Sequence, residues 1–220
     1  GGEAAAQPTA APAEPAPAPG KYNESPMMAE RVAAGELPPV DERLPGEPMV
    51  VEVYEEIGQY GGTIITGSLS SNLYGGDSQR YSDQENALRI REDIGGAVPN
   101  VLKDWDFSDD FTELTCYMRK GMRWSDGAPL TADDVVFWWE DIMNNEELTP
   151  VLPKYFRPGA ENKPMDLVKV DDYTYKFTFH APNPSFIVLN LAHRYSLGNG
   201  YFKPRHYLEQ FHIKYNPQAG

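Results

Sequence analysis

Residues 118–145 read MRKGMRWSDGAPLTADDVVFWWEDIMNN, and this stretch decides how the chain around it folds. Thr131 precedes an apolar repeat and is a good helix N-cap. Asp133 and Asp134 follow in the first turn, where the helix dipole favours negative charge. The helix should stop at Asn144-Asn145. Apolar residues at three- and four-residue spacing predict one buried stripe: Val135, Trp138, Trp139, Ile142 and Met143.

The paired carboxylates of this stretch allow two interpretations. Two nearby carboxylates can act as general acid and base. Adjacent helical residues, however, point about 100° apart, so Asp133 and Asp134 do not converge on one substrate atom by themselves. Helix capping explains both residues, and we favour it. An extracytoplasmic hydrolase that uses Asp104, Asp106, Asp133 and Asp134 stays open as the rival hypothesis.

Alternation of apolar and polar residues predicts strands on both sides of this helix. Residues 111–119 alternate and read as a half-buried strand that ends at Lys120-Gly121. Residues 167–180 read as a hairpin with Asp171-Asp172 as its turn. Residues 61–69 (GGTIITGSL) read as another strand, and residues 83–92 as a short helix. In the hairpin, one face should carry Tyr173, Tyr175, Phe177 and Phe179.

Composition excludes several classes of protein. The net charge is −14 and basic clusters are absent, which argues against a nucleic-acid partner. No apolar run approaches the roughly 18 residues of a membrane span. The single cysteine, Cys116, reads as a buried inert thiol. The four histidines (180, 193, 206 and 212) lack the spacing of metal ligands, so we expect no metal site. We also expect no catalytic residue and no cofactor.

The N-terminal region differs in composition from the rest of the chain. Sixteen of residues 1–20 are Ala, Pro or Gly, a composition that cannot form a packed core. Proline-rich chain is extended and stiff, which suits a spacer. We expect a disordered tether and linker over residues 1–50, with one short helix at 27–34 (MMAERVAA).

Several of these motifs occur together in one known family. The segment VPNVLKDWDFSDDFTELTCYMRKGMRWSDGAPLTADDVVFWWEDI (98–142) resembles the signature region of the family 5 solute-binding proteins, the peptide-, nickel- and oligosaccharide-binding subunits of bacterial ABC importers. GGTIITG (61–67) is similar to the family's first core strand. Its later hairpin is matched by residues 170–192, and FKPRHYLE (202–209) matches the return to the first lobe. The resemblance extends over roughly residues 60 to 212. The family pattern has Phe or His where Trp124-Ser125 stands before Asp126-Gly127.

The resemblance implies an α/β fold of the periplasmic-binding-protein-like type II class, a two-lobed clamp of which this chain is the N-terminal part. Residues 51–74 would hold the first strands of lobe I, residues 75–197 an inserted second subdomain, and residues 198–220 a truncated return to lobe I. In this family the block around Asp133 and Asp134 is scaffold. The Ala/Pro-rich tail fits the spacer behind a lipidated cysteine that this chain does not contain.

The implied function is capture of a solute outside the cytoplasm and its delivery to an ABC permease in the membrane, without catalysis. An oligopeptide is the first expectation for the ligand, an oligosaccharide the second, and a monomer the expected state. A surface adhesion module is a third class. Trp105 could face the cleft, although packing under the next strand is favoured. The candidate ligand-binding residues are Ser70, Ser71, Asn72, Leu73, Tyr74, Asn199 and Tyr201.

Overall fold

The structure is a computed structural model of the chain, and it describes residues 21–219 except 52, 54, 64, 66–85, 92 and 193–199. Contacts divide the chain after Arg43 into two units, which are described separately. Among the described residues, no helix is both long enough and apolar enough to traverse a lipid bilayer.

The first unit contains two short helices, α1 (Pro26–Ala33) and α2 (Val40–Arg43). The short helix predicted for residues 27–34 is thus confirmed, and α2 was not predicted. Arg43 of α2 donates a hydrogen bond to the carboxylate of Glu24, which lies just before α1. No residue of α1 or α2 is buried.

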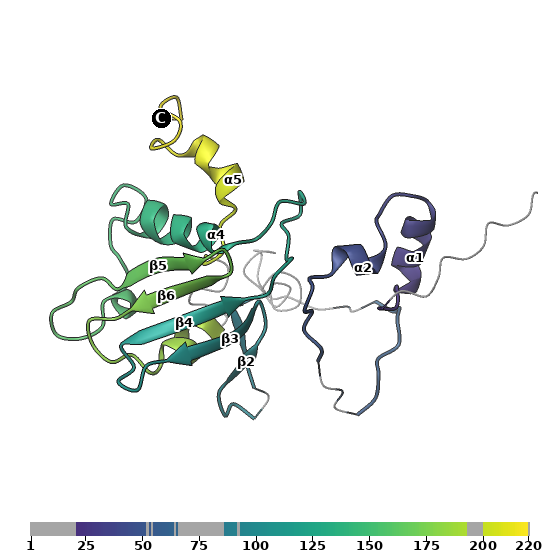
Figure 1. The fold of residues 1–220 in the computed structure, drawn as a ribbon, viewed down its shortest axis with the longest axis horizontal. Coiled ribbons are helices and arrows are strands. Elements are labelled where there is room, and N and C mark those ends of the chain that lie inside the picture. The colour runs from purple at the N-terminus through teal and green to yellow at the C-terminus, as the bar shows by residue number, and fades with distance from the viewer. Residues whose placement is uncertain are drawn as a thin grey trace, which may run out of the picture. The chain divides into compact units, whose positions relative to one another are not determined.

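The second unit is built on a four-stranded antiparallel sheet (Figure 1). The strand order is β3-β4-β6-β5, and a two-stranded ribbon, β1-β2, lies beside it. The strands are β1 (Leu88–Ile90), β2 (Ala97–Pro99), β3 (Leu102–Phe107), β4 (Glu113–Met118), β5 (Asp166–Asp171) and β6 (Thr174–Thr178).

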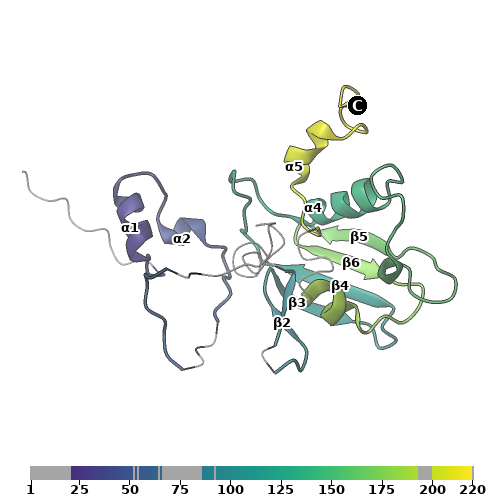
Figure 2. The same ribbon diagram turned by 180° about the vertical axis from the view of Figure 1, so that it is seen from behind.

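Short helices surround the sheet. Helix α4 continues directly into a π-helical turn, η1, and both lie next to β5 in Figures 1 and 2. The ribbon β1-β2 packs against η3. The helices are α4 (Ala132–Phe137), η1 (Trp138–Met143), η2 (Lys154–Phe156), η3 (Ile187–Ala192), α5 (Arg205–Leu208) and η4 (Glu209–Phe211).

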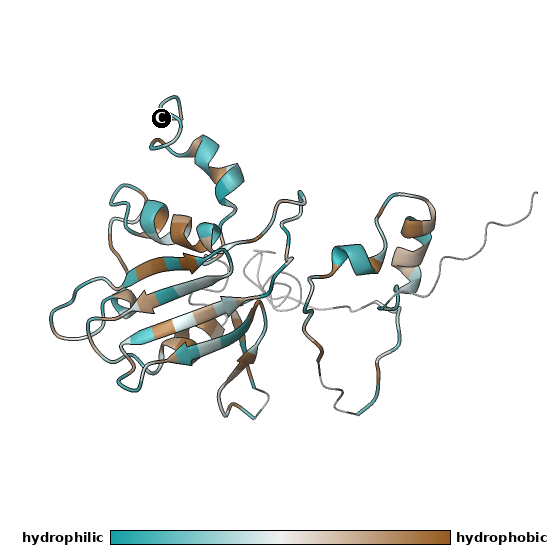
Figure 3. Ribbon diagram, in the orientation of Figure 1, coloured by the Kyte–Doolittle hydropathy of each residue, from teal (hydrophilic) through white to brown (hydrophobic). Residues whose placement is uncertain are grey.

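The core fills the space between the sheet and these helices. In β4 the burial alternates, with Leu114, Cys116 and Met118 buried, because successive strand residues point to opposite faces. Figure 3 shows the resulting mixture of apolar and polar positions along the strands. Other core side chains include Trp138, Trp139, Phe156, Tyr175, Phe177, Phe179, Phe186, Leu191 and Tyr201.

The predicted strand and hairpin are confirmed. Strand β4 coincides with the alternating run at 111–119, and β5-β6 with the hairpin at 167–180. The hairpin turn occurs at Asp171-Asp172, where the Asp171 carboxylate accepts the Tyr173 N–H at 2.8 Å. Of the aromatic face, Tyr175, Phe177 and Phe179 are buried, and Tyr173 is partly buried.

One local prediction was wrong, and another is contradicted only in its described part. Residues 83–92 were predicted as a helix, but Leu88–Ile90 forms β1 and pairs with Ala97–Pro99. Leu88 is fully buried there, so tertiary packing overrides the local helix preference. Residues 61–63 and 65 are irregular rather than strand. The other residues of the predicted strand, 64 and 66–69, lie outside the described residues.

A turn at Asp126-Gly127 precedes α4. Gly121 and Gly127 have φ of +88° and +90°, a region that favours glycine. The Gly127 N–H donates to the Trp124 carbonyl at 2.9 Å, and the Asp126 carboxylate accepts the Ala128 N–H at 3.0 Å. This compact turn lies in the connection between β4 and the start of α4.

Candidate functional site

Most of the predicted ligand-binding residues lie outside the described part of the chain: Ser70, Ser71, Asn72, Leu73, Tyr74 and Asn199. Tyr201 is described, and it is a core residue with 1% of its surface exposed. Its hydroxyl donates a hydrogen bond to the Tyr175 hydroxyl, and its ring lies 5.2 Å from the Trp138 ring. The structure therefore gives Tyr201 a packing role, and the ligand role of all seven residues stays a prediction.

Asp134 connects three distant parts of the second unit. Its carboxylate is 4% exposed and accepts three hydrogen bonds. The donors are the Thr131 N–H at 2.9 Å, the Trp124 indole N–H at 3.2 Å and the Arg205 N–H at 2.9 Å. The first is the reciprocal bond of a capping box. Asp134 thus begins α4, fixes the preceding turn and holds α5.

Asp133 has a different environment. Its carboxylate is 43% exposed and forms an ion pair with Lys169 of β5 at 2.8 Å. Lys169 also pairs with Asp172 at 2.7 Å, so the pair belongs to a small surface network. The neighbouring carboxylates therefore point to different partners, as the helical geometry predicted. This arrangement favours scaffold over acid–base chemistry at this pair.

The other carboxylates of the hydrolase hypothesis, Asp104 and Asp106, lie on β3 at the opposite edge of the sheet from β5. The edge strands β3 and β5 are three interstrand spacings apart, a distance of about 14 Å. This distance exceeds the roughly 5–10 Å that separates the two carboxylates of a glycosidase. Asp106 accepts the Tyr117 hydroxyl at 3.0 Å, and this bond raises the pKa of Tyr117. Asp104 accepts the Trp105 N–H at 2.9 Å, while Trp105 itself packs partly buried against the core.

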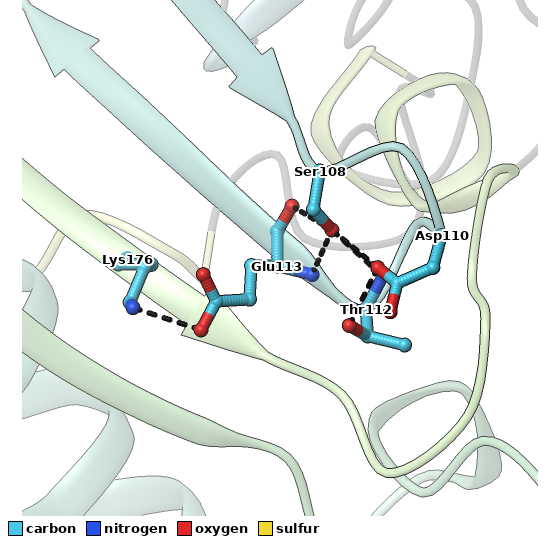
Figure 4. A network of polar contacts seen from close by, with 5 residues as sticks. All are labelled: Ser108, Asp110, Thr112, Glu113 and Lys176. Carbon is cyan, nitrogen blue, oxygen red and sulfur yellow. Dashed lines mark hydrogen bonds and ion pairs between the residues drawn. The ribbon is translucent and has the colours of Figure 1, made fainter.

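A further Ser-Asp-Thr cluster occupies the β3-β4 turn (Figure 4). The Asp110 carboxylate accepts the Ser108 hydroxyl at 2.7 Å and the Thr112 hydroxyl at 2.8 Å. These two hydrogen bonds lower the pKa of Asp110. The backbone N–H groups of Thr112 and Glu113 also donate to the Ser108 hydroxyl. The side chains of Ser108 and Asp110 therefore close this turn, in which Phe111 has a φ of +56°.

The histidines have separate partners. His206 contacts the Asp126 carboxylate at 2.6 Å, and His180 lies 3.6 Å from Asp166. His212 is buried and contacts the backbone of η1, while His193 lies outside the described residues. Within the described ranges, no group of three or more His, Cys, Asp or Glu side chains could hold a metal ion.

Cys116 should be unreactive in the folded protein. The residue is fully buried in β4, and burial raises the pKa of its thiol well above the ordinary value. Because the thiolate is the reactive form, we expect no labelling by dithionitrobenzoate at pH 8 in buffer. One equivalent should react in denaturant, since the chain has one cysteine.

Rapid labelling of the native protein would contradict this placement of Cys116.

The raised pKa of the Cys116 thiol in the folded state also sets the sign of the pH dependence of stability. The neutral thiol is favoured in the folded state, and this contributes to the free energy of unfolding. The contribution is fully present below the ordinary thiol pKa of about 8.5, and it is lost as the pH rises above that value.

A groove of about 740 Å³ lies between residues 48–51 and the ribbon β1-β2. Its apolar side includes Met49, Ile90 and Val98, and its rim includes Arg91 and Arg119. Arg119 is held in place because it donates to the carbonyls of Asn100 at 2.6 Å and Glu47 at 2.9 Å. Residues 44–51 belong to the second unit. The boundaries predicted for the lobes stay predictions.

Comparison with known proteins identifies the class of fold. The model of the bacterial extracellular solute-binding proteins, family 5 Middle, matches residues 96–216, more than half of the chain. The structure superposes on an oligopeptide-binding protein OppA with a TM-score of 0.74 and 37% identity, covering 90% of this chain and 30% of that one. It also superposes on MelB of Agrobacterium fabrum C58, solved in complex with stachyose, with a TM-score of 0.68 and 30% identity; 89% of this chain and 31% of that one are covered.

Two relatives that match by sequence are also periplasmic binding proteins. A periplasmic alpha-galactoside-binding protein of Rhizobium meliloti (strain 1021) is 32% identical over 89% of this chain, and the match covers 30% of that relative. The periplasmic oligopeptide-binding protein OppA of Salmonella typhimurium is 29% identical over 51% of this chain and 23% of its own length. The chain thus spans less than a third of the length of these relatives.

Proposed function

The chain belongs to the bacterial extracellular solute-binding proteins of family 5, and from that premise we propose that it is part of the substrate-binding component of an ABC importer. The solute that we propose first is an oligopeptide. The observation that carries this proposal is the superposition of the structure on an oligopeptide-binding protein at 37% identity over 90% of this chain. The periplasmic relatives support a place outside the cytoplasm.

The mechanism that we propose is capture without chemical change. Ligand binds between two lobes and favours their closure, and the closed form is what the membrane permease recognises. An extended peptide can pair its backbone with a strand edge, which gives affinity with loose side-chain specificity. The structural contacts of Asp133 and Asp134 support the same view, because both carboxylates already stabilise α4 and its neighbours.

The finer parts of the proposal concern assembly and anchoring. The protein acts as a monomer and meets the permease only in its liganded form. Residues 1–20 serve as a spacer between the folded units and a lipidated cysteine ahead of them, which would make the protein a lipoprotein. Their Ala- and Pro-rich composition supports the spacer.

An oligosaccharide is the second candidate solute. The observation that favours it is the 32% identity to an alpha-galactoside-binding protein over 89% of this chain, together with the similarity to MelB, whose structure holds stachyose. In that case the ligand would be an α-galactoside rather than a peptide. The fold and the proposed clamp motion would be unchanged.

Thermal unfolding with two ligand sets tests and separates these candidates. The sample is the natural protein that carries these 220 residues. One set is a mixture of tri- to pentapeptides, the other is raffinose with stachyose, and free amino acids with glucose are the control. A ligand at a hundredfold its dissociation constant stabilises by about 2.7 kcal/mol, which raises the midpoint by several degrees.

Each outcome has a distinct meaning. A shift with peptides alone supports the first candidate, and a shift with α-galactosides alone replaces it by the second. An unchanged midpoint with both sets at millimolar concentration would contradict both candidates.

A further inference from the structure

The groove between residues 48–51 and the ribbon β1-β2 is held in shape on both sides. On one side, the residues just ahead of the groove are anchored, because the Gly46 N–H donates to the Lys120 carbonyl at 3.1 Å and Glu47 pairs with Lys103 at 2.8 Å. On the other side, β1 and β2 form an antiparallel pair. The volume of about 740 Å³ lies within the range of small-molecule sites, so the groove has the size and the fixed walls that a ligand requires.

The lining of the groove is mainly apolar. Met49, Ile90 and Val98 line it together with Pro48 and Pro99. Among the described residues, the polar side chains of the lining are those of arginine and aspartate only. A peptide or a sugar carries many polar groups, and each of them costs free energy when it is buried without a partner. A ligand with a plain hydrocarbon body is therefore the better fit to this lining.

Arg119 places a fixed positive charge at the rim. The residue is partly buried, and its guanidinium donates to the Asn100 carbonyl at 2.6 Å and to the Glu47 carbonyl at 2.9 Å. Both acceptors are neutral backbone groups. Within the described part of the chain, Arg119 forms no ion pair, since the Glu47 carboxylate is paired with Lys103. A guanidinium has five N–H groups, so Arg119 is oriented by its two acceptors and keeps donors for an anion.

Arg91 and Asp93 lie on the same rim. They form an ion pair at 2.6 Å, with 51% and 58% of their side chains exposed. Asp93 also accepts the Gly95 N–H at 2.8 Å, which stabilises the turn between β1 and β2. The Asp93 carboxylate therefore competes with an incoming anion for Arg91.

We propose that this groove binds a free alkyl carboxylate, a small molecule with one carboxylate and an unbranched hydrocarbon tail. The carboxylate pairs with Arg119, because a guanidinium matches the two oxygens of a carboxylate in geometry and charge. The tail lies along Met49, Ile90 and Val98. A chain with a net charge of −14 repels small anions in general, so such binding requires a local positive site of this kind. The groove is a second site, separate from the solute site of the proposed function.

Titration calorimetry at low ionic strength tests the site on the natural protein that carries these 220 residues. The probe is octanoate, octanol offers the same tail without the charge, and butyrate offers the charge with a shorter tail. Octanoate should bind with one equivalent. Octanol should bind about ten- to a hundredfold more weakly, because it lacks the charge-assisted hydrogen bonds. Butyrate should also bind more weakly, by about fourfold for each buried methylene that it lacks.

Variants of two arginines assign the binding to the groove. Arg119→Gln should weaken octanoate binding by about ten- to a hundredfold and leave octanol binding unchanged. Arg119→Lys keeps the charge without the forked geometry, so its loss should be smaller. Arg123→Gln is the matched control, because Arg123 is exposed, lies outside the groove lining and also donates to a backbone carbonyl, that of Gly127, at 2.9 Å. This control should bind octanoate as the wild type does.

Asp93→Asn tests the site by a gain of affinity, which decides the matter if Arg119→Gln also loosens the groove. Asparagine keeps an oxygen for the Gly95 N–H but removes the charge that competes for Arg91. Octanoate should therefore bind about two- to fivefold more tightly, on the scale of one exposed ion pair, while octanol binding stays the same. A substitution that only perturbed the fold would weaken both ligands.

Three results would overturn the proposal. The first is absence of octanoate binding to the natural protein, the result expected where another part of the chain fills the groove. The second is an equal loss of affinity in Arg119→Gln and Arg123→Gln. The third is tighter binding of a pentapeptide ending in leucine than of octanoate, dependent on Arg119 and lost when its C-terminus is amidated. That result would show that the groove binds the carboxylate of a peptide and not that of a free acid.

Discussion

Replacing Asp134 by alanine should destabilise the protein by about 3–5 kcal/mol, whereas replacing Asp133 by alanine should cost less than about 1 kcal/mol. The Asp134 carboxylate is buried and accepts hydrogen bonds from Thr131, Trp124 and Arg205. Its removal leaves three donors without a partner, and each costs about 1 kcal/mol or more. Asp133 loses only an exposed ion pair with Lys169. Urea unfolding followed by circular dichroism measures both variants.

Asp134→Asn is the conservative control for this pair. An amide keeps one accepting oxygen, so the loss should be intermediate between those of wild type and alanine. Equal stability of Asp133→Ala and Asp134→Ala would contradict the structural role of Asp134. The hydrolase hypothesis makes the opposite prediction, because there both variants lose turnover while their stability stays intact.

Replacing Trp138 by alanine should cost about 3–5 kcal/mol, as for other buried aromatic side chains. Trp138 is 2% exposed and lies at the centre of an aromatic cluster. Its ring is 5.7 Å from Trp139, 5.6 Å from Phe156 and 5.2 Å from Tyr201 in edge-to-face or tilted geometry. The substitution leaves a cavity among Trp139, Phe156 and Tyr201. Urea unfolding monitored by circular dichroism gives the change in free energy.

Trp105→Ala is the matched control, since it removes the same side chain from a partly buried position on the edge strand β3. Its cost should be about 1–2 kcal/mol, in proportion to the smaller buried area. A Trp138 variant as stable as the Trp105 variant would show that the tryptophans of η1 are not the centre of the core. It would then contradict the packing role that the structure gives to Trp138.

Local sequence patterns predicted a large part of the second unit. The strand β4, the hairpin β5-β6 and the start of α4 each follow from a pattern of neighbouring residues, with a period of two or of three to four. The buried Cys116 follows from the same alternation. These elements are those in which local preference and tertiary packing agree.

Features that depend on distant residues were not predicted. Strand β1 arises from pairing with β2 and not from its own composition. The π-helical turn η1 lets Asp141 meet Lys214, which is 73 positions away in the sequence, and the bond from Arg205 to Asp134 joins residues 71 positions apart.

The candidate ligand site was predicted from family resemblance and not from chemistry. Apart from Tyr201, its residues lie outside the described ones, and Tyr201 belongs to the core. A solute site assembled between two lobes has no spacing rule in one sequence. Its residues come from segments far apart in the chain, and their convergence depends on the complete fold.

Mass spectrometry of the bound ligand tests most directly whether this is a binding protein. The natural protein that carries these residues is incubated with the ligand set that raises its unfolding midpoint, and the bound fraction is separated, released and weighed. The account predicts one equivalent of ligand per protein, with a mass identical to that of the ligand supplied. Recovery of shortened peptides or monosaccharides, in amounts that grow with time, would contradict it and would identify a hydrolase.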